Sequence, residues 1–343
     1  MKKSLILAIS VLFLMGSYLY ADSSIKKILS IGANEPNYLF MTITGVIIDE
    51  NKNIYVSDSG GPFLRKYSSK GEFIKEIGRL GEGPGEFSNS IGPLFYDGQS
   101  LYLLDNLNHR IVVIDKELEI KNYINIKGLK TSLAKLDDFY YLKSTRPGEP
   151  FQEIGIYDQS GKQISAFFNE RPAFLREKLF NRQDYPVWMM YSGLAMDVDS
   201  ESKEVAVTFN YPDEKIELYF FNKDGSLKRK HMIDNIFKYK FPEFLLKMPA
   251  NYPQESKIVY IKSIHYLTNE KILLQYWVAD YKFEKCQSEK HYLLLIDKVN
   301  GKLIQKFEIN PSFEILSIRN KILCGREIED DMPKVALYKI EGY

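Results

Sequence analysis

One pattern of four short strands recurs along this chain and constrains its fold more than any other feature. In residues 45–78, the segments "GVIID", "NIYVSD", "FLRKYS" and "EFIKEIG" are rich in Val, Ile, Tyr and Phe, and Gly, Asn and Asp separate them. Such segments are typical of β-strands joined by turns. Copies of the pattern follow one another at residues 45–78, 92–126, 133–168, 193–233, 262–309 and 313–340. The sequence therefore predicts an all-β protein of six four-stranded units.

The sixth copy lacks its last strand. A strand-like segment at residues 24–32, "SIKKILSIG", precedes the first copy and belongs to no repeat. We expect this segment to complete the sixth unit and close a ring, because closure covers strand edges that would otherwise aggregate. The prediction is a six-bladed β-propeller with four-stranded blades. A β-sandwich array is the alternative.

The N-terminal residues indicate export. Residues 1–21 combine a basic start, an apolar run and a small residue at Ala21, which is the layout of a secretory signal peptide. We expect residues 22–343 to form the propeller domain in the periplasm or outside the cell, without a transmembrane segment after signal removal. An uncleaved N-terminal anchor is the alternative. The 46 basic and 45 acidic residues nearly cancel, so no long-range attraction to nucleic acid is expected.

The second copy resembles a known repeat. The segment "GRLGEGPGEF" is followed by "GPLFYDGQSLYLLDNLNHRIVVID", in which Asp105, Asn108 and Arg110 stand in the pattern Asp-x-x-Asn-x-Arg-Ile. This resembles an NHL-type repeat, where such residues link the second and third strands. In the first copy Asp58 and Arg65 stand further apart. The whole chain after the signal also looks like exported bacterial six-bladed propellers of unassigned function, a resemblance that implies fold more than activity.

The same motif has a structural interpretation and a functional one. An aspartate and an asparagine in a tight loop cap backbone N–H groups, and an arginine can bond the loop or a neighbouring blade. We therefore interpret Asp105, Asn108 and Arg110 as residues that stabilise the blade, with the loss of Asp105 costing about 1 kcal/mol as one lost turn cap. A binding site at this loop is the alternative.

The two faces of the predicted ring differ. On one face, tight hairpins such as "SSKGE", "DKELE" and "DQSGK" join strands, and we expect glycine or asparagine to supply the left-handed residue of each turn. The other face, here called the loop face, carries long aromatic connections at 169–193 and 234–260. Long loops on a rigid scaffold commonly carry function.

The loop face is accordingly the predicted binding surface. The alternative is that its apolar side chains pack on one another and cap the channel. The candidate binding residues are Arg171, Arg176, Arg182, Tyr185, Trp188, Tyr191, Tyr239, Phe244 and, on the same face, His109.

Motifs for catalysis and metal binding are weak. The innermost strands are expected to begin with Thr44, Ile91, Ser132, Ser192, Lys262 and Phe313, and among the residues at these starts only Glu314 is acidic, which disfavours a calcium hydrolase. His109, His265 and His291 fall in blades two and five, which are not adjacent, so a zinc site is not expected. We expect no catalytic residue, no metal and no cofactor.

The predicted function is binding of a protein, peptide or glycan over the loop face, with no nucleic-acid partner. The alternatives are a propeller enzyme, such as a lyase or lactonase, with its site at the channel mouth, and a purely structural module of an envelope assembly.

The two cysteines form a disulfide candidate. Cys286 is expected in the loop between the second and third strands of the fifth blade, and Cys324 at the end of the second strand of the sixth. An exported protein with two cysteines can form one disulfide, and adjacent blades could bring the pair within reach. Free thiols are the alternative.

Overall fold

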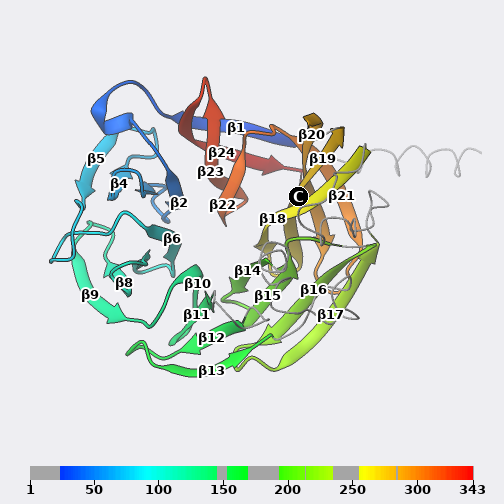
Figure 1. Ribbon diagram of the computed structural model, residues 1–343, viewed down its shortest axis with the longest axis horizontal. Helices are drawn as coiled ribbons and strands as arrows, with labels where there is room; N and C mark the ends of the chain where they lie inside the picture. The colour runs from blue at the N-terminus through cyan, green and yellow to red at the C-terminus, as the bar shows by residue number, and fades with distance from the viewer. Residues whose placement is uncertain are drawn as a thin grey trace, which may run out of the picture.

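The chain forms a ring of six antiparallel sheets, each of four strands (Figure 1). The computed structural model describes residues 24–144, 153–168, 193–212, 214–234, 255–282 and 285–342. The predicted six-bladed β-propeller is confirmed. Within the described residues the one helical element is a short 3₁₀ turn, η1 (Pro36–Tyr38).

The first three blades run outward from the channel in chain order. Blade 1 consists of β2 (Ile43–Ile48), β3 (Ile54–Asp58), β4 (Phe63–Tyr67) and β5 (Phe73–Ile77). Blade 2 consists of β6 (Ile91–Tyr96), β7 (Leu101–Asp105), β8 (Arg110–Ile114) and β9 (Ile120–Asn125). Blade 3 consists of β10 (Lys130–Leu136), β11 (Phe139–Ser144), β12 (Glu153–Tyr157) and β13 (Gln163–Phe167).

The last three blades follow the same order up to the closure. Blade 4 consists of β14 (Leu194–Asp199), β15 (Glu204–Phe209), β16 (Lys215–Asn222) and β17 (Leu227–Asp234). Blade 5 consists of β18 (Glu255–Thr268), β19 (Lys271–Lys282), β20 (Lys285–Asp297) and β21 (Leu303–Ile309). Blade 6 consists of β22 (Glu314–Arg319), β23 (Ile322–Glu329), β24 (Met332–Glu341) and β1 (Ser24–Ile31).

The N-terminal strand closes the ring. β1 pairs antiparallel with β24, from Ser24 opposite Glu341 to Ile31 opposite Val335 (Figure 1). The predicted closure is therefore confirmed. Ile31 is buried in one cluster with Val56 of blade 1 and Cys324 of blade 6, so the closing strand contributes to the core as well as to the sheet.

The core lies between neighbouring blades. All five residues of β3 and all five of β7 are buried, because a middle strand is covered by a blade on each side. This explains why "LYLLD" is an almost continuous apolar run rather than an alternating one.

Polar side chains join each blade from 2 to 6 to the next blade in the ring. Each comes from, or directly follows, the second strand and bonds the backbone of the next innermost strand or of the residue just before it. The bonds join Asn106 Oδ1 to Lys130 N (3.0 Å), Lys143 Nζ to Leu194 O (3.0 Å), Asn210 Nδ2 to Ile261 O (2.5 Å), Gln275 Nε2 to Phe313 O (2.6 Å) and Arg326 Nη1 to Ile43 O (2.9 Å). These polar residues are thus part of the scaffold.

The hairpins of the opposite face follow the predicted turn chemistry with one exception. Gly71, Gly161, Gly225 and Gly301 have φ between 72° and 84°. In blade 2 the equivalent residue is Leu118, with φ 58°, so the expectation of glycine or asparagine in every turn was wrong there. Leu118 is buried in the core between blades 1 and 2, and this burial offsets the backbone strain.

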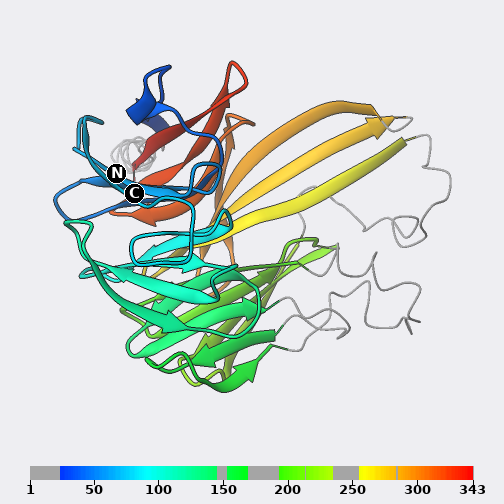
Figure 2. The same cartoon turned by 60° about the vertical axis from the view of Figure 1, so that its left-hand side comes forward.

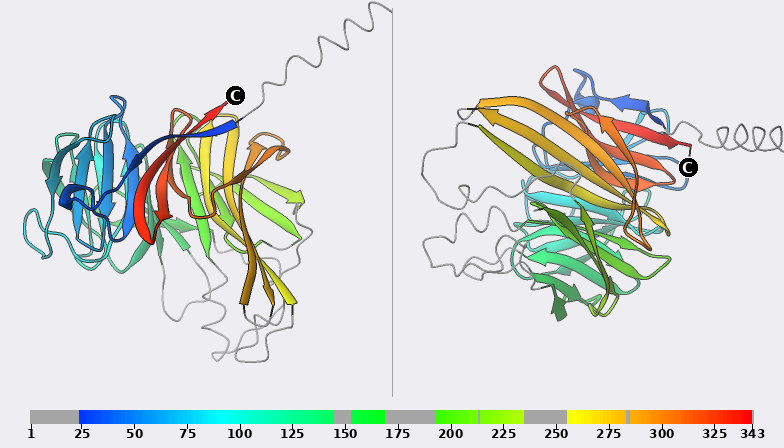
Figure 3. Two further views of the ribbon diagram at one scale, coloured as in Figure 1. Left: turned by 90° about the horizontal axis from the view of Figure 1, so that it is seen from above. Right: turned by 90° about the vertical axis from the view of Figure 1, so that its right-hand side faces the viewer.

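Blade 5 is longer than the others. β18, β19 and β20 have 14, 12 and 13 residues, whereas the strands of blade 1 have five or six. The surplus extends past the ring on the loop face (Figures 2 and 3). Residues 255–260, predicted as part of a long connection, instead pair with 277–282 as a sheet.

Candidate functional site

The Asp105 motif is satisfied entirely by contacts within the chain. The buried Asp105 carboxylate accepts hydrogen bonds from Ser88 N (3.0 Å), Asn108 Nδ2 (2.8 Å) and Arg110 Nε (2.9 Å). Arg110 also donates to the carbonyls of Glu82 and Glu86. These contacts tie the loop before β6 to the turn between β7 and β8, as the structural interpretation requires. His109 is exposed beside this turn, with φ 50°.

The other predicted binding residues lie outside the described residues. These are Arg171, Arg176, Arg182, Tyr185, Trp188, Tyr191, Tyr239 and Phe244. Their role stays a prediction. The connections that contain them join β13 to β14 and β17 to β18.

The two cysteines of the disulfide candidate are not bonded to each other. Both are free thiols, Cys286 exposed and Cys324 buried. Cys286 lies in β20 rather than in a loop, because the hairpin of blade 5 continues through it, and it is paired with Tyr281. Cys324 lies in the core cluster between blades 6 and 1, where burial raises the pKa of its thiol to about 12.

A set of polar side chains lines the side of blade 5 that faces blade 6. We call Ser263, His265, Trp277 and His291 the polar column. Trp277 stands directly opposite His291 in the β19–β20 pairing. Ser263 stands opposite Gln275, and His265 stands opposite Leu273. Leu273, Gln275 and Trp277 are two positions apart in β19, so their side chains lie on the same side of the sheet.

The register of β18 depends on a β-bulge. Lys262 is the extra residue between the paired Ile261 and Ser263. A bulge re-aims the side chains that follow it. Ser263 therefore lies on the same side as Tyr260, which is paired with Trp277, although the two residues are three positions apart.

Among the residues that the structure describes, each member of the polar column has a buried atom without a hydrogen-bond partner. These atoms are Ser263 Oγ, His265 Nε2, Trp277 Nε1 and His291 Nδ1. A buried polar group without a partner costs about 1–3 kcal/mol. Such groups call for a bound molecule or ordered water, and here four of them belong to one side of one blade.

His265 approaches an acidic residue of blade 4. Its Nδ1 is 3.9 Å from Oδ2 of Asp197, which also accepts a hydrogen bond from Tyr266 N (2.9 Å). Burial raises the pKa of the Asp197 carboxyl to about 7 and lowers the pKa of His265 to about 4. Between about pH 4 and pH 7 the Asp197 carboxyl is therefore protonated and the His265 imidazole is neutral.

Charged side chains lie near Ser263 and His291 of the polar column. Glu314 and Arg326 of blade 6 form an ion pair with an N–O distance of 2.9 Å. Glu289 Oε1 lies 2.6 Å from Nε2 of His291. Burial lowers the pKa of the Lys262 ammonium, while Glu314 and Glu289 oppose that shift. The loop-face end of blades 5 and 6 therefore combines two cations with two carboxylates.

The two ends of the channel differ. At the hairpin face, the guanidinium of Arg319 from blade 6 lies 4.7 Å from the ring centroid of Tyr96 in blade 2. The Tyr96 hydroxyl donates to Glu50 (2.5 Å), so this end is tied together by interactions within the chain. β2 and β6 carry no acidic, basic or histidine residue. The groups suited to binding therefore gather at the loop-face end of blades 4 to 6.

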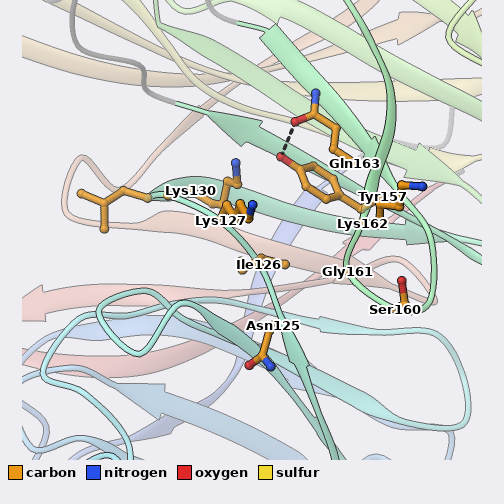
Figure 4. A pocket seen from close by; sticks show the side chains of 11 residues that line it. Asn125, Ile126, Lys127, Lys130, Tyr157, Ser160, Gly161, Lys162 and Gln163 are labelled. Atoms are coloured by element: carbon orange, nitrogen blue, oxygen red, sulfur yellow. Dashed lines mark hydrogen bonds between the residues drawn. The ribbon is translucent and has the colours of Figure 1, made fainter.

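A cavity lies between blades 2 and 3 (Figure 4). Its volume is about 710 Å³, and Lys127, Lys130 and Lys162 are among its lining residues. Lys127 and Lys162 are exposed, and the Lys130 ammonium lies 5.1 Å from the ring centroid of Tyr157. The Tyr157 hydroxyl donates to Gln163 Oε1 (3.1 Å), so this pair is already satisfied. The cavity therefore lacks the unpartnered groups of the polar column.

Within the part of the chain that the structure describes, no group of three or more His, Cys, Asp or Glu residues could hold a metal ion. The same ranges contain no helix long and apolar enough to cross a membrane.

Sequence reasoning did not identify the polar column. His265 and His291 were considered only as zinc ligands together with His109, and Trp277 and Ser263 were not singled out. Their common side of the sheet follows from the strand register and from the bulge at Lys262. A bulge is not visible in the alternation of the segment "KSIHYL".

Comparison with solved structures finds the following similar proteins. A candidate exported protein of Bacteroides fragilis is 14% identical, with a TM-score of 0.58 over 94% of this chain and 97% of that one. Virginiamycin B lyase from Staphylococcus aureus is 8% identical, with a TM-score of 0.48 over 93% and 99% of the two chains. BamB from Moraxella catarrhalis is 10% identical, with a TM-score of 0.41 over 93% and 99%.

No family model matches the chain, and no curated protein matches it either. The likeness to the Bacteroides fragilis protein concerns the fold alone. The chain is therefore a six-bladed β-propeller whose function has to be argued from its own residues.

Proposed function

We propose that this protein is an exported binding protein whose ligand sits at the loop-face mouth of the channel, against blades 5 and 6. The polar column is the observation that carries the proposal. Its four buried, unpartnered atoms belong to a wall that neighbouring side chains hold in place, with Gln275 joining blade 5 to blade 6 through Phe313 O and Ile315 N.

The surroundings of the polar column suit a binding site. Loops on a rigid scaffold are common places for ligands. The extension of blade 5 forms one wall beside the mouth, and the aromatic connections at 169–192 and 235–254 supply the remaining contacts in this proposal. Export rests on the signal-like residues 1–21, and the likeness to a candidate exported protein agrees with it.

A thermal-shift screen of the mature chain tests the proposal. The probes are neutral oligosaccharides, short peptides, inorganic phosphate and calcium, each offered to the wild type and to the double variant Ser263→Ala/His291→Gln. We expect one class to raise the wild-type midpoint and to lose this effect in the double variant. His109→Gln, an exposed histidine in blade 2, is the matched control. Equal shifts in the wild type and the double variant would reject the mouth as the site.

One observation favours an enzyme as the second candidate. His265 has Nδ1 toward the Asp197 carboxyl, and its Nε2 has no partner among the described residues. Above about pH 7, where that carboxyl is ionised, Nε2 can take a proton from a substrate in the channel. A lyase or lactonase would use such a group. The assay offers the wild type a panel of lactones and of uronic-acid-containing oligosaccharides. Turnover of one of them that is lost in His265→Gln would place this candidate first. Equal turnover in both proteins would exclude His265 as its base.

A further inference from the structure

We infer that the ligand at the mouth is a neutral, hydroxyl-rich molecule of the carbohydrate class. This inference rests on the proposed binding function and specifies its ligand. It follows from which atoms of the polar column donate hydrogen bonds and which accept them.

Trp277 and His291 form a donor and an acceptor side by side. The Nε2 atom of His291 lies 2.6 Å from Glu289 Oε1. A carboxylate only accepts hydrogen bonds, so Nε2 carries the proton and Nδ1 is left as an acceptor. The indole of Trp277 only donates. Residues directly opposite in antiparallel strands have Cβ atoms about 5 Å apart, a spacing at which a single hydroxyl group is a suitable bridge between a donor and an acceptor.

The donor–acceptor pair excludes most ligand groups. A carboxylate cannot donate to His291 Nδ1, and an ammonium group cannot accept from Trp277 Nε1. A metal ion could bind the imidazole but would leave the indole N–H unsatisfied. A hydroxyl group both donates and accepts, and it satisfies the two atoms at once.

The rest of the mouth favours a neutral molecule with several hydroxyl groups. Lys262 and Arg326 balance Glu289 and Glu314, so no net charge remains to attract an ion. Ser263 offers a third partner on the same side of the blade, and its hydroxyl can also donate or accept.

Aromatic rings of blades 4 and 5 lie next to these groups. Tyr260 packs edge-on against Tyr211, with centroids 4.9 Å apart, and against Trp277, with centroids 6.3 Å apart. Ligand sites commonly combine aromatic walls with a few placed polar groups. A sugar ring matches this combination, because it carries hydroxyl groups at its edge and C–H groups on its faces.

A peptide amide also donates and accepts, and it is the competing ligand. The polar groups here succeed one another along the column, and the charged residues Lys262 and Glu314 stand beside them rather than apolar pockets. A peptide would need such pockets for alternate side chains. We therefore favour the carbohydrate, and the experiment compares it with the peptide.

Isothermal titration calorimetry with the mature chain tests the inference. The probes are malto-, cello- and chito-oligosaccharides, with tri- to pentapeptides of glycine and serine as the second arm. Trp277→Phe removes the donor, and His291→Gln keeps a donor toward Glu289 but removes the Nδ1 acceptor. Each variant should weaken saccharide binding about threefold to tenfold, the loss of one hydrogen bond. Ser263→Ala serves as a third variant if Trp277→Phe fails to fold, and His109→Gln should bind like the wild type.

The outcomes separate the inference from the proposed function. Peptide binding that depends on Trp277 and His291, without saccharide binding, would overturn the carbohydrate and leave a binding site at the mouth. Absence of binding by either arm, with ordered water satisfying the four atoms, would overturn the inference. Saccharide binding unchanged in all three variants would overturn both the inference and the proposed site.

Discussion

Replacing Asp105 by alanine should destabilise the protein far more than the loss of one turn cap. The Asp105 carboxylate is fully buried and accepts bonds from Ser88 N, Asn108 Nδ2 and Arg110 Nε. Removing it leaves the largely buried Arg110 guanidinium without its counter-ion. Breaking a buried ion pair from one side typically costs 3–5 kcal/mol. Arg110 keeps two carbonyl acceptors and the face of Tyr123, 4.5 Å from its ring centroid, so we expect about 3 kcal/mol.

Urea denaturation followed by circular dichroism measures this cost. Asp58→Ala in blade 1 is the matched comparison, because Asp58 accepts from Met41 N, Thr42 N and Gly60 N but is not paired with Arg65. Arg65 instead bonds Glu76 and Leu39 O. Water can replace Asp58 at the exposed Met41, so we expect only about 1–2 kcal/mol there. The double variant Asp105→Ala/Arg110→Ala should cost less than the sum of the single variants.

The result that would refute this reasoning is a loss below about 1 kcal/mol for Asp105→Ala, within the ordinary range of a turn cap. Retained stability with lost ligand binding would show that the motif is a site instead of a stabilising link.

Three further predictions concern the scaffold. Lys298→Met should cost about 3 kcal/mol in urea denaturation, because Lys298 Nζ joins blade 5 to Asp199 (3.1 Å) and Glu204 (3.2 Å) of blade 4; a variant as stable as the wild type would contradict this. Gly225→Ala should lower the thermal midpoint more than Gly98→Ala, since both have positive φ but only the first would place Cβ 3.0 Å from the Phe167 side chain; equal midpoints would count against it. The third prediction concerns pH. Burial raises the pKa of the Glu204 and Asp199 carboxyl groups, but hydrogen bonds outweigh it and hold both pKa values below the ordinary ones. The donors are Arg229 and Lys228 for Glu204, and Ser202 and Lys298 for Asp199. Their unfolded forms bind protons first on acidification, so stability from these groups is full above about pH 4.5 and falls below it; a urea midpoint that does not fall between pH 5 and pH 3 would contradict this.

The ring could be predicted because its signals are local. Strand alternation and turn residues mark each blade, and the odd strand at residues 24–31 has a matching vacancy in blade 6. The turn at Leu118 shows the limit of such signals. Its left-handed backbone is tolerated because of burial between two blades, which a local pattern does not report.

The extension of blade 5 could not be predicted for a similar reason. The segment "ADYKFEKCQSEK" is charged and is typical of a loop. Its residues 279–282 and 285–290 are strand in the structure because β18, β19 and β20 pair with one another there, and such pairing can override local preference.

The candidate site was harder to predict from the sequence than the extension of blade 5. His265 and His291 are 26 positions apart, and their common side of the blade depends on the register of three strands and on the single bulge at Lys262. A shift of one residue in that register would turn the polar column to the other side.

Histidine-selective ¹⁵N NMR tests the central claim most directly, because the chain has four histidines and the claim divides them two and two. His265 and His291 belong to the polar column, whereas His109 is exposed in blade 2 and His231 bonds Lys298 O. On addition of the neutral oligosaccharide mixture, we predict that the imidazole signals of His265 and His291 shift and that those of His109 and His231 stay in place. Shifts confined to His109 or His231, or four unchanged signals, would contradict a ligand site at the mouth of blades 5 and 6.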